Sequence, residues 1–181
     1  MDNMQSIAVI GGGGWGSTIA KILGENGHQV RIWCHKAPSA LQINRNHTTR
    51  RLPGVMLPES VTATHILKAA MQSVDAVVIA LSSSQFEHIP AIKSTIPSGA
   101  PILLLTKGLA PDDKTLLISD YLRDQLPGHS IAHLSGPNIA KEIADKKPSA
   151  TVVASEDEAV ADMFQALLSN DYFRVYRSQD C

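Results

Sequence analysis

The sequence has few cysteines and no long apolar run. Only Cys34 and Cys181 are present among its 181 residues, far apart and without metal-ligand spacing. Reduced thiols in a reducing compartment are therefore the default, and a disulfide framework or a zinc module is disfavoured. No segment approaches the roughly 20 apolar residues of a membrane span, and the first residues lack the basic and apolar regions of a signal peptide. We therefore expect a cytoplasmic protein without a membrane span.

The chain also lacks an excess of charge and any internal repeat. Its net charge is −1 at pH 7, with 18% charged and 44% hydrophobic residues. Balanced charge gives no reason to expect a nucleic-acid partner, and the composition is that of a globular protein. A length of 181 residues suits one large domain with a substantial core.

The nucleotide-binding pattern GxxxxGK[ST] is absent, which disfavours a P-loop nucleotidase. A different glycine cluster is present in the segment IAVIGGGGWGSTIA, residues 7–20, where the order of residue types predicts a strand, a tight turn and a helix. Gly11 would form the turn, Gly13 would let the backbone approach a pyrophosphate, and Gly16 would let the helix pack on the strand. The segment predicts dinucleotide binding, and a merely structural turn is the alternative.

An acidic residue is missing where an NAD-selective site would have one. The second predicted strand, residues 30–33, is followed by Cys34, His35 and Lys36, and Arg31 lies nearby. A site for NADP places cations here to meet the 2′-phosphate, so His35 and Lys36 predict that NADP is accepted. The alternative is a polar pair that starts a surface loop. A methyltransferase that binds S-adenosylmethionine, the other class with such a turn, would normally carry an acidic residue at this strand end.

Predicted strands and helices alternate along the chain. Residues 75–81 and 101–106 are apolar runs without polar alternation, as expected for strands buried on both faces. Other strands are expected near residues 7–10, 30–33, 61–64, 131–134, 150–154 and 173–176, and helices from the glycine turn to residue 26 and at 39–46, 66–72, 85–96, 115–125, 138–145 and 158–169. This order predicts a doubly wound, largely parallel α/β sheet of the Rossmann-like class.

Polar residues follow three of the predicted strands. They are the serines at 82–84, Lys107, and the segment SGPN at 135–138. Ligands bind at the carboxyl ends of strands in such sheets, which makes these residues candidates for the site. Lys107 is the most informative, because a lysine there could bind a phosphate or polarise a carbonyl. Each position also has a structural interpretation: a helix N-cap, a solvated lysine beside a turn, and a turn that leads into a helix.

Five segments together resemble one known family. They are GGGGWG at 11–16, LPGVMLPESV at 52–61, TKGL at 106–109, SGPNIAKEIA at 135–144 and FRVYRSQD at 173–180. These segments are similar, in order and spacing, to the motifs GxGxWG, LPxxxLP, TKG, SGPxxAxE and FRVY of NAD(P)-dependent glycerol-3-phosphate dehydrogenases of the bacterial biosynthetic type. The resemblance covers essentially the whole chain.

The resemblance implies roles for individual residues. Gly14 and Trp15 match cofactor contacts of the glycine turn, and His35 matches the position beside the adenosine ribose and its 2′-phosphate. Lys107 matches a lysine that reaches both the nicotinamide end of the cofactor and the substrate, and is the one catalytic candidate in this chain. Three further positions match in the fourth segment: Gly136 and Asn138 as substrate contacts, and Ala140 as a cofactor contact.

The same resemblance implies a reaction. The family reduces dihydroxyacetone phosphate to sn-glycerol 3-phosphate with NADH or NADPH, and so supplies the backbone of phospholipids. Its members continue into a helical second domain that carries a general acid/base lysine in a GGxxKN motif and an Arg-Asn pair for the substrate phosphate. Neither feature occurs in this chain.

We therefore expect residues 1–181 to form the NAD(P)-binding domain alone, with the catalytic domain missing. Such a fragment would bind cofactor without turnover. The full-length protein could form a homodimer. The alternative is a free-standing, non-catalytic dinucleotide-binding module.

Overall fold

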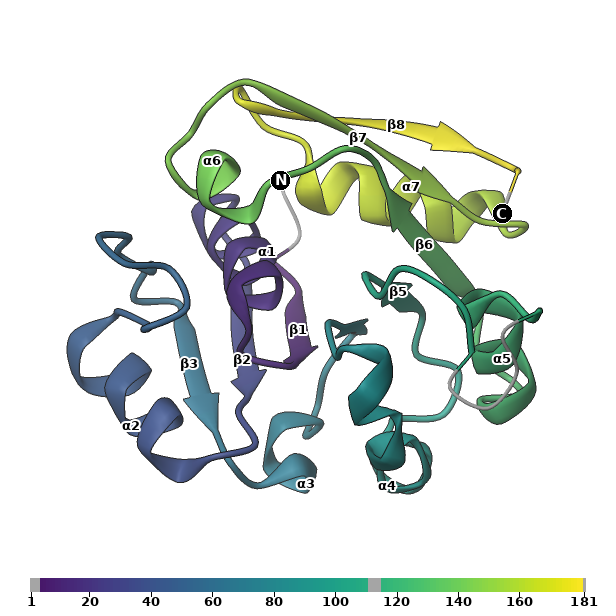
Figure 1. The fold of residues 1–181 in the computed structure, drawn as a ribbon, viewed down its shortest axis with the longest axis horizontal. Coiled ribbons are helices and arrows are strands. Elements are labelled where there is room, and N and C mark those ends of the chain that lie inside the picture. The colour runs from purple at the N-terminus through teal and green to yellow at the C-terminus, as the bar shows by residue number, and fades with distance from the viewer. Residues whose placement is uncertain (1–3, 111–114, 181) are drawn as a thin grey trace.

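The computed structural model describes residues 4–110 and 115–180, in which helices lie on both sides of an eight-stranded sheet (Figure 1). The strands are β1 (Ser6–Ile10), β2 (Gln29–Trp33), β3 (Val61–Thr64), β4 (Ala76–Ile79), β5 (Ile102–Leu104), β6 (Ile131–Ser135), β7 (Ser149–Ala154) and β8 (Phe173–Ser178). Their order is β3-β2-β1-β4-β5-β6-β7-β8, and every neighbouring pair is parallel except β6 and β7. The predicted doubly wound, largely parallel α/β fold is confirmed.

The helices follow the predicted order. They are α1 (Gly14–Glu25), α2 (Ala37–Asn46), α3 (Leu67–Ala70), α4 (Ile89–Thr95), α5 (Ile118–Gln125), α6 (Ala140–Ala144) and α7 (Glu158–Leu168), with a 3₁₀ helix η1 (Ser83–His88) before α4. Each predicted helix exists, but several are shorter than predicted. The stretch predicted as one helix at 85–96 is divided, because Pro90 lies in the first turn of α4 and the turn before it is 3₁₀.

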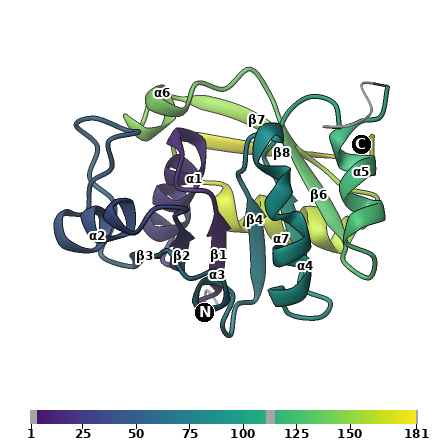
Figure 2. The same cartoon turned by 60° about the horizontal axis from the view of Figure 1, so that its bottom comes forward.

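Strand β1 shows how the core is built on both faces of the sheet. Ile7 and Val9 belong to one hydrophobic cluster, to which α1 and α7 contribute, while Ala8 and Ile10 belong to a second, to which α4 and α5 contribute. All four side chains are fully buried. Successive strand residues point to opposite faces, so a central strand covered by helices on both faces must be apolar throughout (Figure 2).

The position of β1 also determines where a ligand can bind. It lies between β2 and β4, with Val9 paired to Ile32 on one side and Val78 on the other. The chain order reverses at this point, so the loops that leave β1 and β4 at their carboxyl ends run in opposite directions. A crevice at this edge is the usual ligand site of such sheets.

Helix α3 is shorter than the helix predicted at 66–72. The guanidinium of Arg31 on β2 donates hydrogen bonds to the carbonyl of Ala69 in the helix, at 2.8 Å, and to that of Gln72 just after it, at 3.1 Å. Ser73 then takes a left-handed conformation, with φ of 54°, and ends the segment. Arg31 is therefore a cap for α3 and does not line the cavity described below.

In residues 4–110 and 115–180, no helix has the length and apolar character needed to cross a bilayer. No group of three potential metal ligands occurs in this part of the chain either. Cys34 is a free, buried thiol, and burial raises its pKa to about 11. Cys181 lies outside the described residues.

Candidate functional site

The glycines of the turn between β1 and α1 serve different purposes. Gly11 has φ of 120°, and a Cβ there would lie 2.7 Å from the carbonyl oxygen of Ala80. A Cβ on Gly16 would lie 2.0 Å from the carbonyl oxygen of Gly11, so α1 can start this close to β1 only with glycine. By contrast, a Cβ on Gly13 would meet nothing within 4 Å. Gly11 and Gly16 are required by the fold, whereas Gly13 presents a bare backbone to open space.

The N-terminus of α1 is left without a side-chain partner. Gly13 is the N-cap residue and offers no capping side chain, and the first turn holds no acidic residue. The first N–H groups of a helix have no partner within the helix, and the helix dipole adds a partial positive charge there. This end of α1 can therefore receive an anion such as a pyrophosphate.

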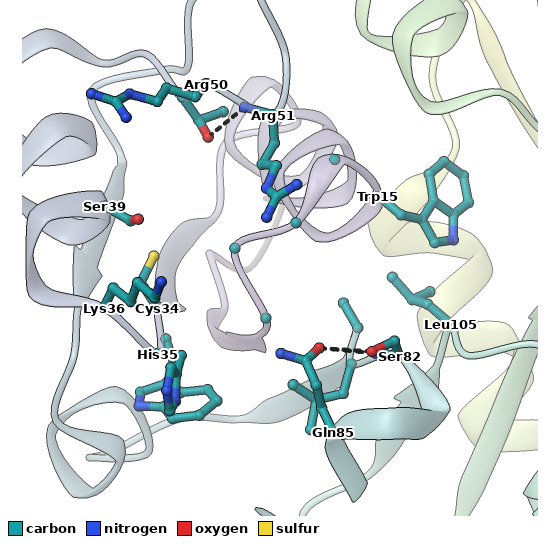
Figure 3. Close-up of a pocket in the computed structure, with 18 of the residues that line it drawn as sticks. Trp15, Cys34, His35, Lys36, Ser39, Arg50, Arg51, Ser82, Gln85 and Leu105 are labelled. Atoms are coloured by element: carbon teal, nitrogen blue, oxygen red, sulfur yellow. Dashed lines mark hydrogen bonds between the residues drawn. The ribbon is translucent and has the colours of Figure 1, made fainter.

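A cavity of about 1310 Å³ lies in front of this helix end. It is bounded by the glycine turn, the end of β2 with the start of α2, the loop at 49–51, and the ends of β4 and β5 (Figure 3). Seven of the residues predicted from the sequence line it: Gly11, Gly13, Gly14, Trp15, His35, Lys36 and Lys107. Gly12, which was not predicted, lines it as well. Gly16, Gly136, Asn138 and Ala140 do not line it.

The charges around the cavity are of one sign. Lys36, Arg50, Arg51 and Lys107 line it, and no Asp or Glu is among its described lining residues. None of the four takes part in an ion pair within the described part of the chain. Unpaired cations that converge on one cavity favour an anionic ligand. Arg50 and Arg51, which stand just before the LPG segment, were not predicted as site residues from the sequence.

An aromatic cluster holds His35 at the end of β2. The ring of His35 lies 5.3 Å from the ring of His88, and both approach Trp33 edge-on, at 6.1 Å and 5.2 Å between ring centroids. The indole N–H of Trp33 donates to the carbonyl of His65 at 3.2 Å, which orients the centre of the cluster. The rings of Trp33 and His88 therefore hold the His35 ring in place, and His35 and Lys36 both line the cavity.

The end of β4 supplies a polar wall. Ser82 donates hydrogen bonds to Oε1 of Gln85 from its backbone N–H, at 3.2 Å, and from its hydroxyl, at 3.0 Å. The amide oxygen of Gln85 is therefore engaged, and its amide nitrogen faces the cavity in Figure 3. The capping interpretation of the serines at 82–84 describes Ser82 well, and Gln85 is a donor at the site that sequence reasoning missed.

Lys107 joins the ends of β5 and β6. Its ammonium group donates to the carbonyl of Gly136 at 2.5 Å, which brings the TKG and SGP segments together. Gly136 itself has φ of 156°, and a Cβ there would lie 2.8 Å from Oδ1 of Asn138. The amide of Asn138 donates to the carbonyl of Ala150 at 2.8 Å, so this side chain is already held in place. Lys107 borders the cavity, with the predicted substrate residues beyond it.

His133 lies behind Lys107. Its Nε2 is 3.1 Å from the carbonyl oxygen of Thr106. Burial lowers the pKa of His133, and the charges of Lys107 and Arg123 lower it further, against a smaller opposing effect of the Thr106 carbonyl. The lowered pKa of His133 disfavours a further positive charge beside Lys107.

Two predicted cofactor residues face the protein interior. Ala140 starts α6, and its carbonyl accepts a hydrogen bond from the hydroxyl of Thr18 at 3.1 Å, which ties α6 to α1. Trp15 packs against the core, and its Nε1 is a buried donor without a partner among the described residues. Trp15 still borders the cavity, while Ala140 lies outside it.

The donor set of the cavity fits a nicotinamide dinucleotide. A bare helix N-terminus lies at the turn, the space at Gly13 is open, and cations surround it without a competing carboxylate. His35 and Lys36 stand at the end of β2, where the adenosine ribose of such a cofactor is held in Rossmann-like folds.

Comparisons with known proteins give the same family as the motifs. Residues 6–161 match the model of the NAD-dependent glycerol-3-phosphate dehydrogenase N-terminus. A glycerol-3-phosphate dehydrogenase [NAD(P)+] of Alcanivorax borkumensis is 41% identical over 178 residues, covering 97% of this chain and 52% of that protein. One of Pseudomonas entomophila is 38% identical over 182 residues, covering 99% of this chain and 53% of that protein.

Solved structures agree. A crystal structure of glycerol-3-phosphate dehydrogenase from Coxiella burnetii has a TM-score of 0.91 at 30% identity, covering 98% of this chain and 55% of that one. The chain thus spans about half the length of the relatives it matches. On the family model and on these matches, the chain belongs to the family of the NAD-dependent glycerol-3-phosphate dehydrogenase N-terminus.

Proposed function

We propose that residues 1–181 form the cofactor-binding domain of an NAD(P)-dependent glycerol-3-phosphate dehydrogenase. The protein would interconvert dihydroxyacetone phosphate and sn-glycerol 3-phosphate, and would supply glycerophospholipid synthesis. The observation that carries the proposal is the cavity with the bare glycine turn at one end and Lys107, joined to Gly136, at the other. The cytoplasmic location and a homodimer stay predictions.

In this proposal, residues along the cavity bind different parts of the cofactor and the substrate. The N-terminus of α1 would bind the pyrophosphate, and His35 with Lys36 would meet the adenosine end, including the 2′-phosphate of NADP. A bound nicotinamide supplies the hydride. Lys107 would lie beside the carbonyl oxygen of the substrate, and its ammonium group would stabilise the negative charge that forms there. Gly136 and Asn138 would form the first wall of the substrate site.

Cofactor binding by the 181-residue chain tests the proposal directly. Titration with NADH and NADPH, followed by nucleotide fluorescence, should give saturable binding of both. Phosphate-containing buffers should be avoided, because free phosphate would compete for the same cations. A chain that binds neither nucleotide would overturn the proposal. Binding without any activity after a homologous catalytic domain has been joined would favour the non-catalytic dinucleotide-binding module instead.

A further inference from the structure

Arg51 lies across the cavity from the glycine turn. It follows α2 in the loop that leads to β3, and Figure 3 shows its guanidinium projecting toward the turn at the start of α1. Arg50 extends in another direction, toward the side where Ser39 and Lys36 lie. The two neighbouring arginines therefore reach different parts of the cavity.

The backbone of Arg51 is fixed, although its side chain is exposed. Its N–H donates to Oγ1 of Thr49 at 3.2 Å, and the next N–H, of Leu52, donates to the carbonyl of Thr49 at 3.2 Å. Leu52 is only 2% exposed and packs with Val55 and Ala144. This anchored turn places the carbonyl oxygen of Arg51 3.4 Å from where a Cβ of Gly14 would lie. The loop is held against the start of α1 by buried contacts.

The charge of Arg51 has no partner in the described protein. It makes no ion pair, and no carboxylate lines the cavity into which it projects. Its guanidinium faces a helix end that also carries partial positive charge. Two positive groups on opposite sides of an open space repel each other unless an anion lies between them. Arg can bind phosphate oxygens through two parallel hydrogen bonds, which suits this geometry.

We propose that Arg51 binds the pyrophosphate of the dinucleotide from the side opposite the N-terminus of α1, and so completes the phosphate site. This inference rests on the proposed cofactor-binding function. Arg51 would bind the pyrophosphate, which NADH and NADPH share, whereas the residues at the end of β2 would bind the 2′-phosphate of NADPH. Arg51 therefore contributes to affinity for both cofactors, and Lys36 to the discrimination between them.

The test compares three ligands and three variants of the 181-residue chain. NADH and NADPH contain the pyrophosphate, whereas adenosine 2′-monophosphate has the 2′-phosphate alone. Arg51→Gln should weaken the binding of NADH and NADPH about tenfold to a hundredfold each and leave the binding of adenosine 2′-monophosphate unchanged. Lys36→Gln should weaken NADPH and adenosine 2′-monophosphate but spare NADH. Arg45→Gln, on the exposed end of α2 and away from the cavity, is the matched control.

Two further measurements keep the result interpretable. Arg51→Lys keeps the charge but loses the planar fork, so it should recover only part of the affinity. Thermal melting should show that each variant is folded. Equal binding of NADH by wild type and Arg51→Gln would overturn the role of Arg51 but not the proposed cofactor-binding function. A wild-type chain that binds neither cofactor would overturn the proposed function and the role of Arg51 with it.

Discussion

Gly13 and Gly16 are three residues apart, yet a side chain would have opposite consequences at the two positions. Gly13 has φ of −73° and open space around its missing Cβ, so other residues can adopt its conformation. We expect Gly13→Val to keep a cooperative melt and to lose binding of both cofactors, because the valine would occupy the place of the pyrophosphate. Binding titrations with NADH and NADPH, beside a thermal melt, check this. Normal NADPH binding by Gly13→Val would rule out a phosphate site at this turn.

Gly16→Val is the matched comparison. Its Cβ would overlap the backbone of Gly11, at 2.0 Å from the carbonyl oxygen, and neither backbone can move without separating α1 from β1. Overpacking of this kind costs about 1–3 kcal/mol of unfolding free energy. A chemical denaturation curve should show that loss for Gly16→Val and little change for Gly13→Val.

His35 and Lys36 provide the prediction on cofactor choice. No acidic side chain follows β2, so nothing at this strand end repels a 2′-phosphate. We expect NADPH to bind at least as tightly as NADH. Each charge-assisted hydrogen bond is worth about 1.5–3 kcal/mol, or roughly ten- to a hundredfold in affinity. The double variant His35→Ala/Lys36→Ala should lose that factor for NADPH only, and clearly tighter binding of NADH by the wild type would contradict the assignment.

At the scale of elements, Glu25 joins α1 to the segments after α6 and before β8. It forms ion pairs with Lys21 at 2.7 Å and Lys146 at 3.1 Å, and accepts a hydrogen bond from the hydroxyl of Tyr172 at 2.6 Å. Burial raises the pKa of Glu25, but the hydrogen bonds from Lys21, Tyr172 and Lys146 together outweigh it, and the pKa falls below its ordinary value. The side chain of Lys21 is 7% exposed, and Glu25 is its ion-pair partner.

The lowered pKa of Glu25 predicts how stability depends on pH. A carboxyl group with a depressed pKa in the folded state stabilises the fold above its unfolded pKa, and that contribution is lost as the pH falls through the folded value. We expect Glu25→Gln to lose about 1–3 kcal/mol near neutral pH. Urea denaturation should show the difference from wild type shrinking as the pH is lowered toward about 3. Glu59→Gln, at an exposed position that forms no ion pair with any described residue, is the control; an equal effect there would contradict the role of Glu25.

The sequence predicts strands better than helix ends, for a physical reason. The buried strands β4 and β5 appear as unbroken apolar runs, since both faces of the sheet are covered. The end of α3 depends on Arg31, which is more than 30 residues away in the chain. The loop that carries Arg51 depends on the contact of Leu52 with Ala144, more than 90 residues away. Such contacts leave no local pattern, so the position of Arg51 at the cavity could not be predicted from the sequence. The glycine turn, Lys36 and Lys107 could be predicted, because local residue types and strand ends indicate them. Gln85 was missed, although its partner Ser82 is only three residues away.

At the scale of the whole molecule, the two ends of the candidate site differ in how many elements line them. The cofactor end has the turn, the cations and an enclosing loop, while the lysine end offers Lys107, Gly136 and Asn138 on one side. Exposed apolar side chains surround that end: Leu109, Leu117 and Ile139 are 43%, 48% and 60% exposed. The relatives that the chain matches are about twice as long as the chain itself.

The last prediction follows from this asymmetry. Reduction of a ketone needs charge stabilisation and a proton, and positioned acid catalysis typically contributes about 10² to 10⁴ in rate. In the proposed role Lys107 would stabilise charge, but its ammonium group already donates to the Gly136 carbonyl, and no described residue at this end is assigned to hold a substrate phosphate and orient the carbonyl. We expect the 181-residue chain to bind NADPH yet to show no measurable oxidation of it by dihydroxyacetone phosphate.

Joining the chain to the second domain of a homologous dehydrogenase should restore turnover, because that domain would supply the proton donor and the phosphate clamp. In that context Lys107→Ala should lower kcat by about 10² or more and affect NADPH affinity much less, since the proposed pyrophosphate and adenosine contacts would lie at the other end of the cavity. Steady-state kinetics and NADPH titration of the same preparations separate the two effects. Robust turnover by the isolated chain that survives the loss of Lys107 would show that the reacting carbonyl lies elsewhere.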